Sequence, residues 1–299
     1  MKHLIRPLVL LLALVLPGYA AHARPAPDQP MDTRLLQRTD LAYRFSRLLI
    51  DSADGQRHYQ LWIGRPVRPA PKGGFPVLWM LDGNAAVGAL DAELLSQLAH
   101  GKAPLLVAVG YDTPLRIERT ARTYDYTPPR PGLTDQTDPL TGQPSGGADV
   151  FLDLLRDRLL PAVAAKALIN REQQALWGHS YGGLLVLHAL RTRPGEFADY
   201  AAASPSLWWG DGIVAKQLND LKTRKTDPKT RLLLMRGTDE PGNPRGPVVG
   251  PPDRLMQQLT TDMQGVAGLS VDYHPFTGMS HGQTLPASLR YVMHRLYIE

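Results

Sequence analysis

The chain contains a serine whose neighbours could make it a nucleophile. Ser180 is the centre of Gly-His-Ser-Tyr-Gly at residues 178–182. In a G-x-S-x-G elbow the serine occupies a strained strand-to-helix turn, which needs small residues around it. The run 174–177 before the motif favours a strand, and the apolar run 183–190 after it favours a helix. We therefore predict that Ser180 is a catalytic nucleophile rather than part of an ordinary glycine-rich turn.

A serine nucleophile needs a base, which in this order of elements comes last in the chain. His281 lies in Thr-Gly-Met-Ser-His-Gly at 277–282, after the last predicted strand and before a C-terminal helical segment. We predict that it takes the Ser180 proton, and that His179, beside the nucleophile, orients or packs. The other histidines are less suitable as the base. His3 and His22 lie in the N-terminal segment that is predicted below to be a signal peptide, and His58 and His100 come too early in the chain. The remaining three lie within or beside predicted helices and strands: His188, His274 and His294.

The acid that would orient the base has two candidates. A predicted strand at 231–235 leads into Asp239 and Glu240. A carboxylate at this point could hold the imidazole in the correct tautomer and stabilise the imidazolium. Both residues could equally be exposed turn residues at the start of a Pro- and Gly-rich stretch. The acid is therefore Asp239, Glu240 or absent.

Acyl transfer also needs donors for the developing oxyanion. The backbone N–H of Tyr181 follows the nucleophile directly, and the elbow itself delivers it. A second donor is expected after an earlier buried strand, where Leu-Asp-Gly-Asn stands at 81–84. Gly83 allows close backbone approach, so we assign the second donor to the N–H of Asn84 and a bracing role to Asp82. The plainer interpretation is that Asp-Gly-Asn is only a turn.

The elements that must position these residues alternate along the chain. Two strands at 41–50 and 58–63 form a hairpin, and further strands and helices follow in a βαβ rhythm. The fold class is α/β: an α/β-hydrolase three-layer sandwich, with a mostly parallel sheet and helices on both faces. An insertion at 112–147 interrupts the pattern. The later strands are expected at 75–81, 104–110, before Ser180, near Tyr200, at 231–235 and at 269–273, and the helices at 85–98, 149–165, after Ser180 and at 252–263.

The first residues have the features of a secretory signal. Lys2 and Arg6 precede an apolar run at 8–16, and Ala-His-Ala at 21–23 suits a signal peptidase. We predict a signal peptide at 1–23, and a single domain at 24–299 in the periplasm. The apolar run is too short to anchor the chain in a bilayer, and no cysteine is present for lipid attachment. No membrane anchor is therefore expected.

Composition excludes other classes of protein. The formal net charge is +5, of which Lys2 and Arg6 contribute two, and charged residues make up 20% of the chain. No basic block interleaved with aromatic residues occurs, so nucleic acid is not an expected partner. The absence of cysteine excludes thiol catalysis and cysteine-based metal sites.

Six motifs stand in order along the chain. They are Leu-Asp-Gly-Asn at 81–84, Asp-Tyr-Thr-Pro at 125–128, Gly-Gly-Ala-Asp at 146–149 with Phe-Leu at 151–152, Gly-His-Ser-Tyr-Gly-Gly at 178–183, Ser-Pro-Ser-Leu-Trp-Trp at 204–209 and Ser-His at 280–281. Together these motifs resemble those of the esterase-D-like α/β hydrolases, and within them the periplasmic ferric-enterobactin and salmochelin esterases. The resemblance covers nearly the whole mature chain. It implies a serine carboxylic-ester hydrolase that relies on serine and histidine with a weak or absent acid; wider relatives place a glutamate where Glu240 stands.

The resemblance implies hydrolysis of the serine trilactone of a catecholate siderophore, which assists iron release and is linked to uptake across the outer membrane. No metal or other cofactor is needed, since iron enters only as part of the substrate. The ferric substrate is anionic and aromatic, so basic and flat side chains should receive it. The candidates are Arg119, Arg122, Arg130 and Trp209, with Trp208 beside it.

Two other functions remain open. One is a secreted carboxylesterase or acyltransferase of other specificity on the same scaffold. The other is a non-catalytic siderophore-binding protein that retains the fold. The intact pair Ser180 and His281 disfavours the second.

Overall fold

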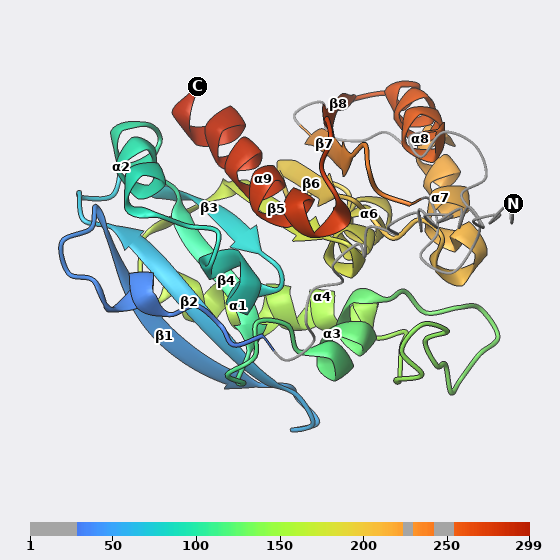
Figure 1. Cartoon of the computed structure of the whole chain (residues 1–299), viewed down its shortest axis with the longest axis horizontal. Coiled ribbons are helices and arrows are strands. Elements are labelled where there is room, and N and C mark those ends of the chain that lie inside the picture. The colour runs from blue at the N-terminus through green and yellow to red at the C-terminus, as the bar shows by residue number, and fades with distance from the viewer. Residues whose placement is uncertain (1–28, 224–229, 242–253) are drawn as a thin grey trace, which may run out of the picture.

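The computed structural model describes residues 29–223, 230–241 and 254–299. The predicted signal peptide at 1–23 and the Pro- and Gly-rich stretch after Pro241 lie outside these residues, as do the first two residues of the helix predicted at 252–263. A twisted sheet runs through the middle of the described chain, with helices on both faces (Figure 1). No helix among the described residues is long and apolar enough to cross a membrane.

The sheet has eight strands in the order β1-β2-β4-β3-β5-β6-β7-β8. The pairs β1–β2 and β2–β4 are antiparallel, and every later pair is parallel. This confirms the predicted hairpin followed by a mostly parallel sheet. The strands are β1 (Tyr43–Asp51), β2 (His58–Pro66), β3 (Phe75–Met80), β4 (Leu105–Tyr111), β5 (Ile169–His179), β6 (Asp199–Ala203), β7 (Thr230–Gly237) and β8 (Leu269–Phe276).

Burial of the strands follows their place in the sheet. β3, β4 and β6 are buried at every residue, because helices cover both faces of the central sheet. The outer strand β1 is mainly exposed or half-buried, with only Tyr43 fully buried. Continuous apolar runs therefore mark the centre of the sheet, which is why the central strands could be predicted.

One helical layer contains α1, α2 and α9, and the other contains α4, α5 and α6 with α3, α7 and α8 (Figure 1). The first layer comprises α1 (Gly83–Val87), α2 (Ala92–His100), α9 (His281–Met293) and η5 (His294–Ile298), with η1 (Arg34–Gln37) beside it. The second comprises α3 (Arg119–Tyr126), α4 (Ala148–Leu154), η2 (Leu155–Leu159), α5 (Leu160–Ala164), α6 (Tyr181–Thr192), η3 (Trp209–Gly212), α7 (Ile213–Gln217), η4 (Leu218–Thr223) and α8 (Arg254–Gln264).

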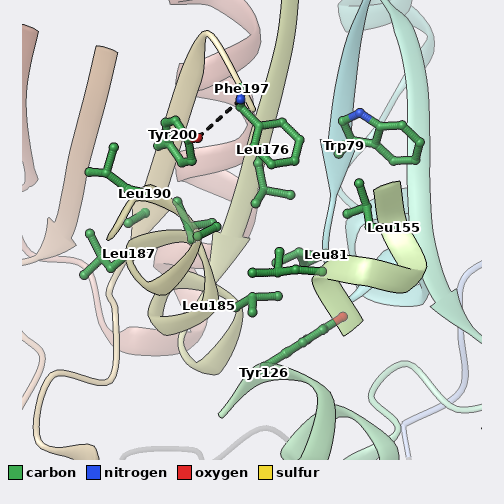
Figure 2. Close-up of a cluster of buried hydrophobic side chains, with 14 of the residues drawn as sticks. Trp79, Leu81, Tyr126, Leu155, Leu176, Leu185, Leu187, Leu190, Phe197 and Tyr200 are labelled. Carbon is green, nitrogen blue, oxygen red and sulfur yellow. Dashed lines mark hydrogen bonds between the residues drawn. The ribbon is translucent and has the colours of Figure 1, made fainter. Parts of the chain in front are cut away.

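The larger core lies between the sheet and the layer that includes α6 (Figure 2). Leu185 and Leu190 of α6 are fully buried there with Trp79 and Leu176 of the sheet. Full burial of a large apolar side chain stabilises the fold by about 1.5–3 kcal/mol. The helix that follows Ser180 is therefore fixed against the sheet by its own apolar side chains.

Two of the helices predicted from the sequence differ from the observed ones in where they end or in their type of turn. The segment predicted at 85–98 is two helices, because α1 ends at Val87 and Asp91 caps α2 by accepting a hydrogen bond from Leu94 N at 2.8 Å. The segment predicted at 149–165 is one continuous helical run with a π-helical turn, η2, in its middle. The predicted insertion at 112–147 contains the helix α3.

Three adjacent parallel strands end in similar strained turns. The residues after β3, β5 and β6 include Asp82, Ser180 and Ser204, with φ values of 50°, 62° and 42°. Positive φ is uncommon for residues with a side chain, and such strain concentrates at functional sites. The active site is therefore expected at the carboxyl ends of β3, β5 and β6.

Candidate active site

Ser180 occupies the turn between β5 and α6, with φ 62° and ψ −117°. The glycines around it permit close backbone packing. A Cβ on Gly178 would lie 2.4 Å from the carbonyl carbon of Gly182, and a Cβ on Gly183 would lie 2.7 Å from Ala203 O. The Ser180 side chain is half-buried, and its Oγ lies 3.4 Å from Ser206 Oγ. The motif thus forms the strained elbow that its sequence predicts.

His281 is the first residue of α9, with its Nδ1 2.9 Å from Glu240 Oε2. An ionised carboxylate only accepts hydrogen bonds, so Nδ1 carries the proton of this bond. The other ring nitrogen, Nε2, is then free of a proton and able to accept one. His281 therefore has the tautomer that a general base requires.

Glu240 is 2% exposed and is held by several donors. Its Oε1 accepts hydrogen bonds from Ser204 Oγ at 2.5 Å, Thr284 Oγ1 at 2.8 Å and Gly237 N at 3.0 Å. Burial by itself raises the pKa of Glu240. The hydrogen bond and the charge of His281, together with the hydrogen bond from Ser204, have a larger effect in the other direction. The pKa of Glu240 is therefore lowered to about 2. Asp239 is exposed. Of the two candidate acids, the structure thus brings Glu240 to the base.

The ring of His179 packs against His281, with ring centroids 4.4 Å apart. His179 is buried, and burial followed by the charge of His281 lowers its pKa well below the usual value. It is therefore a neutral ring behind the base. Its contacts are those expected of a residue that orients or packs.

The two assigned oxyanion donors are both in the first turn of a helix. Tyr181 begins α6, and Asn84 is the second residue of α1. Amides in a first helical turn have no partner within the helix and carry its positive dipole end. The Asn84 side chain is not directed to catalysis, because its Nδ2 lies 3.0–3.1 Å from the carbonyl oxygens of Tyr111, Thr113 and Leu115, which share its two N–H donors. That side chain instead fastens α1 to the segment after β4.

Asp82, just before Asn84, is braced from α3. Arg122 donates from Nε and Nη2 to the two carboxylate oxygens of Asp82 at 2.7 and 2.8 Å, and Tyr126 Oη accepts from Asp82 N at 3.1 Å. The Arg122 side chain is only 13% exposed. The structure thus places this predicted substrate-binding arginine in a buried ion pair that holds the turn leading to Asn84.

The remaining predicted binding residues lie in different environments. Arg119 is exposed at the start of α3. Arg130 lines a surface hollow of about 380 Å³ and lies 3.6 Å from the exposed carboxylate of Asp211. Trp209 is 1% exposed, whereas Trp208 is half-buried and packs on the Tyr181 ring at 6.0 Å. The structure corrects the choice between the two tryptophans, since Trp209 belongs to the core and Trp208 reaches the surface.

Sequence reasoning missed four residues that contact the site. Asp138 accepts hydrogen bonds from Tyr181 Oη and Trp209 Nε1, each at 2.8 Å, and so ties the 112–147 region to the elbow. Ser204 and Thr284 bind Glu240, and Ser206 contacts Ser180. The Ser-Pro-Ser motif and the spacing of Thr284, three residues after His281, were the available signals. The described residues include no group of three or more His, Asp or Glu side chains that could hold a metal ion.

Comparisons with known proteins show similarity to esterases. Residues 52–248 match the model of the Esterase family. The chain is 35% identical over 274 residues to the apo-salmochelin esterase of Escherichia coli O6:H1, covering 91% of this chain and 85% of that protein. It is 28% identical over 262 residues to the ferri-bacillibactin esterase BesA of Bacillus subtilis, covering 82% and 88%.

A solved structure shows the same fold. The enterobactin and salmochelin hydrolase IroE superposes with a TM-score of 0.74 at 32% identity, covering 88% of this chain and 98% of that one. The family model spans more than half of the chain, and the sheet order and elbow are those of an α/β hydrolase. The chain therefore belongs to the Esterase family, has the α/β-hydrolase fold, and is an ester hydrolase similar to siderophore esterases.

Proposed function

We propose that this protein is a periplasmic serine esterase that hydrolyses the trilactone ester bonds of ferric enterobactin or a related catecholate siderophore. The observation that carries the chemistry is the His281–Glu240 pair beside the strained Ser180 elbow. The substrate class is supported by the relatives, whose names describe esterases of salmochelin and of ferri-bacillibactin. The cleavage would lower the iron affinity of the siderophore.

The reaction follows from the roles of the residues. Ser180 Oγ attacks the ester carbon while His281 Nε2 takes its proton, and the amides of Asn84 and Tyr181 stabilise the oxyanion. His281 then returns the proton to the leaving serine hydroxyl, which leaves an acyl-enzyme. Water activated by His281 releases the second product. Glu240 stabilises the imidazolium in both halves of the reaction.

Arg130 is the cation that we assign to an anionic substrate. The hollow it lines also includes Lys216, which is exposed, and the apolar side chains of Leu133 and Ile213. Gly210, in the same hollow, lies four residues beyond Ser206. An ion pair as exposed as Arg130–Asp211 contributes at most about 1 kcal/mol, so a ligand anion can replace Asp211 at little cost. A catecholate arm fits this combination of positive charge and apolar surface.

The periplasmic location rests on the features of residues 1–23, with their basic start, apolar run and Ala-His-Ala site. Expression of the full chain in a Gram-negative host followed by fractionation tests it. We expect the processed protein, beginning near Arg24, in the periplasmic fraction. Unprocessed protein retained in the cytoplasm would contradict the location.

The substrate proposal is tested with purified mature protein and ferric enterobactin, with linear trimer, dimer and monomer separated by chromatography. We expect hydrolysis by the native protein and none by Ser180→Ala, which should still bind the substrate. Fast cleavage of simple aryl or sugar esters with no cleavage of the siderophore would instead indicate a carboxylesterase of other specificity. Binding without cleavage of any ester would indicate a carrier protein.

A matched pair of variants tests the Arg130 hollow. Arg130→Ala should raise KM for the ferric siderophore about tenfold, which corresponds to about 1.4 kcal/mol, and leave a small neutral ester unaffected. Arg171→Ala is the control, because Arg171 is exposed on the same strand as the elbow but near its amino end, away from Ser180. Equal effects of the two variants would show that only overall charge matters.

A further inference from the structure

We propose that the Ser204–Pro205–Ser206 segment positions both ends of the catalytic triad, with Ser206 holding the nucleophile and Ser204 holding the acid. The segment follows β6, which lies between the strand that precedes Ser180 and the strand that precedes Glu240. This inference concerns the ester-hydrolase chemistry itself and does not depend on which ester is the substrate.

Ser206 contacts Ser180 through two groups. Its Oγ lies 3.4 Å from Ser180 Oγ, and its amide donates to Ser180 O at 3.2 Å. Ser206 is 4% exposed, so its hydroxyl is shielded from competing water. When Ser206 donates, the proton of Ser180 remains available to His281. The same donor then stabilises negative charge as it develops on Ser180 Oγ.

Ser204 contacts the acid. Its hydroxyl donates to Glu240 Oε1 at 2.5 Å, and the residue is 1% exposed. Hydrogen bonds to a carboxylate are roughly twice as strong as neutral ones. The bond occupies Oε1 and leaves Oε2 to accept from His281 Nδ1. Ser204 therefore fixes the direction in which Glu240 faces the base.

The segment is held in a strained and crowded conformation. Ser204 has a φ of 42°, and its amide donates to Met235 O of β7 at 2.7 Å. Ser180 N donates to Ala203 O at 3.0 Å, immediately before the segment. A Cβ on Gly183 would lie 3.1 Å from Pro205 Cα, so the segment packs directly on the first turn of α6. Strain of this kind persists only where the surroundings over-determine it.

The segment is thus connected to the nucleophile on one side and to the acid on the other. In acylation the Ser180 Oγ–H proton passes to His281 Nε2, the Oγ–carbon bond forms, and the carbonyl electron pair moves to the oxyanion. The ester C–O bond then breaks and the leaving alcohol takes the proton from His281. Ser206 and Ser204 keep their own protons throughout: Ser206 positions Ser180 Oγ and stabilises the charge that develops on it, and Ser204 positions Glu240.

The test uses a small chromogenic ester, 4-nitrophenyl butyrate, so that its outcome is separate from that of the siderophore experiment. We expect Ser206→Ala to lower kcat about 10- to 100-fold with little change in KM. Inactivation by an organophosphate, diethyl 4-nitrophenyl phosphate, should slow by a similar factor. Ser206→Cys keeps the volume with a weaker donor, so its rate should be intermediate.

Ser204→Ala should also lower kcat about tenfold, and Ser204→Thr, which keeps a hydroxyl, should recover most of it. The loss should depend on Glu240. In a Glu240→Gln background, Ser204→Ala should therefore lower kcat by a much smaller factor, because the carboxylate that Ser204 orients is gone.

Two buried serines away from the triad are matched controls. The Ser288 hydroxyl accepts from Trp177 Nε1 at 3.3 Å, and the Ser52 hydroxyl donates to the Asp54 carboxylate at 2.5 Å, as Ser204 does to Glu240. Ser288→Ala and Ser52→Ala should keep kcat within about twofold. The proposal is overturned if Ser206→Ala matches Ser288→Ala in rate, or if the Ser204→Ala loss persists undiminished in the Glu240→Gln background.

Discussion

His281 Nδ1 and Glu240 Oε2 lie 2.9 Å apart, although 41 positions separate the two residues in the chain. The contact joins the first turn of α9 to the turn after β7. Glu240 stands where the acid of a serine-hydrolase triad contacts the base. Its other oxygen, Oε1, accepts hydrogen bonds from Ser204, Thr284 and Gly237. The structure therefore gives His281 a carboxylate partner, the contact that a triad requires and a serine–histidine dyad lacks.

This geometry predicts different effects for two adjacent carboxylates. Glu240→Gln should lower kcat/KM by about 10²–10⁴-fold, because the amide no longer stabilises the imidazolium or fixes its tautomer. Asp239→Asn should leave the rate nearly unchanged, since Asp239 is exposed. Steady-state kinetics on one soluble ester compare the two variants. Equal rates for Glu240→Gln and the native protein would indicate a dyad.

Glu240 should also make stability depend on pH. Its pKa is lowered from 4.5 to about 2, so the unfolded chain binds a proton at higher pH than the folded protein does. The stabilisation, about 3 kcal/mol, should be present above pH 5 and disappear as the pH falls toward 2. Denaturant unfolding at pH 7, 5, 4 and 3 measures it. The stability gap between the native protein and Glu240→Gln should shrink in acid; a gap independent of pH would contradict the prediction.

The Asp82–Arg122 pair should matter for both stability and rate. Arg122→Met leaves the Asp82 carboxylate buried without its partner, which should cost about 3–5 kcal/mol of unfolding free energy. The double variant Asp82→Asn/Arg122→Met should recover most of that stability. Its kcat should remain about 10- to 100-fold low, because the turn that carries Asn84 is no longer braced. Recovery of kcat together with stability would show that the pair is only structural.

Asp138 should connect the 112–147 region to the elbow. Asp138→Ala removes the acceptor of Tyr181 Oη and Trp209 Nε1, and each lost buried hydrogen bond should cost about 1–3 kcal/mol. Asp138→Asn retains a carbonyl acceptor, so it should lose less. Thermal unfolding and kcat/KM of both variants check this. Identical losses for the two would mean that the negative charge, not the acceptor, is what matters.

Neighbouring glycines in α6 should respond differently to alanine. A Cβ on Gly183 would lie 2.7 Å from Ala203 O, whereas the nearest atom to a Cβ on Gly182 is Leu81 Cβ at 3.4 Å. Gly183→Ala should therefore destabilise the fold and lower the rate by displacing the segment that holds Ser204 and Ser206. Gly182→Ala should be tolerated, since alanine favours a helix by up to about 1 kcal/mol over glycine. Unfolding curves and ester kinetics would refute the argument if Gly182→Ala were the more damaging change.

Local sequence was enough to identify the fold and the first two catalytic candidates. The central strands could be predicted because a strand buried on both faces is a continuous apolar run, as β3 and β4 are. Ser180 could be predicted because a strained elbow restricts its immediate neighbours to small residues. His281 followed from the order of elements, since a base after the last strand reaches the same edge of the sheet.

Only the tertiary structure decided which acid meets the base, which tryptophan is buried and which arginine is paired, because these depend on contacts between residues far apart in the chain. Neither the choice of Glu240 over the adjacent Asp239 nor the burial of Trp209 rather than Trp208 is encoded in a local pattern. Arg122 carries the same charge as Arg130, but its position on α3 places it against Asp82, 40 residues earlier. Residue types and spacing thus determined the chemistry that is available. Which side chains meet depends on how the strands and helices pack, and that also decides which charges are paired and which remain for a substrate.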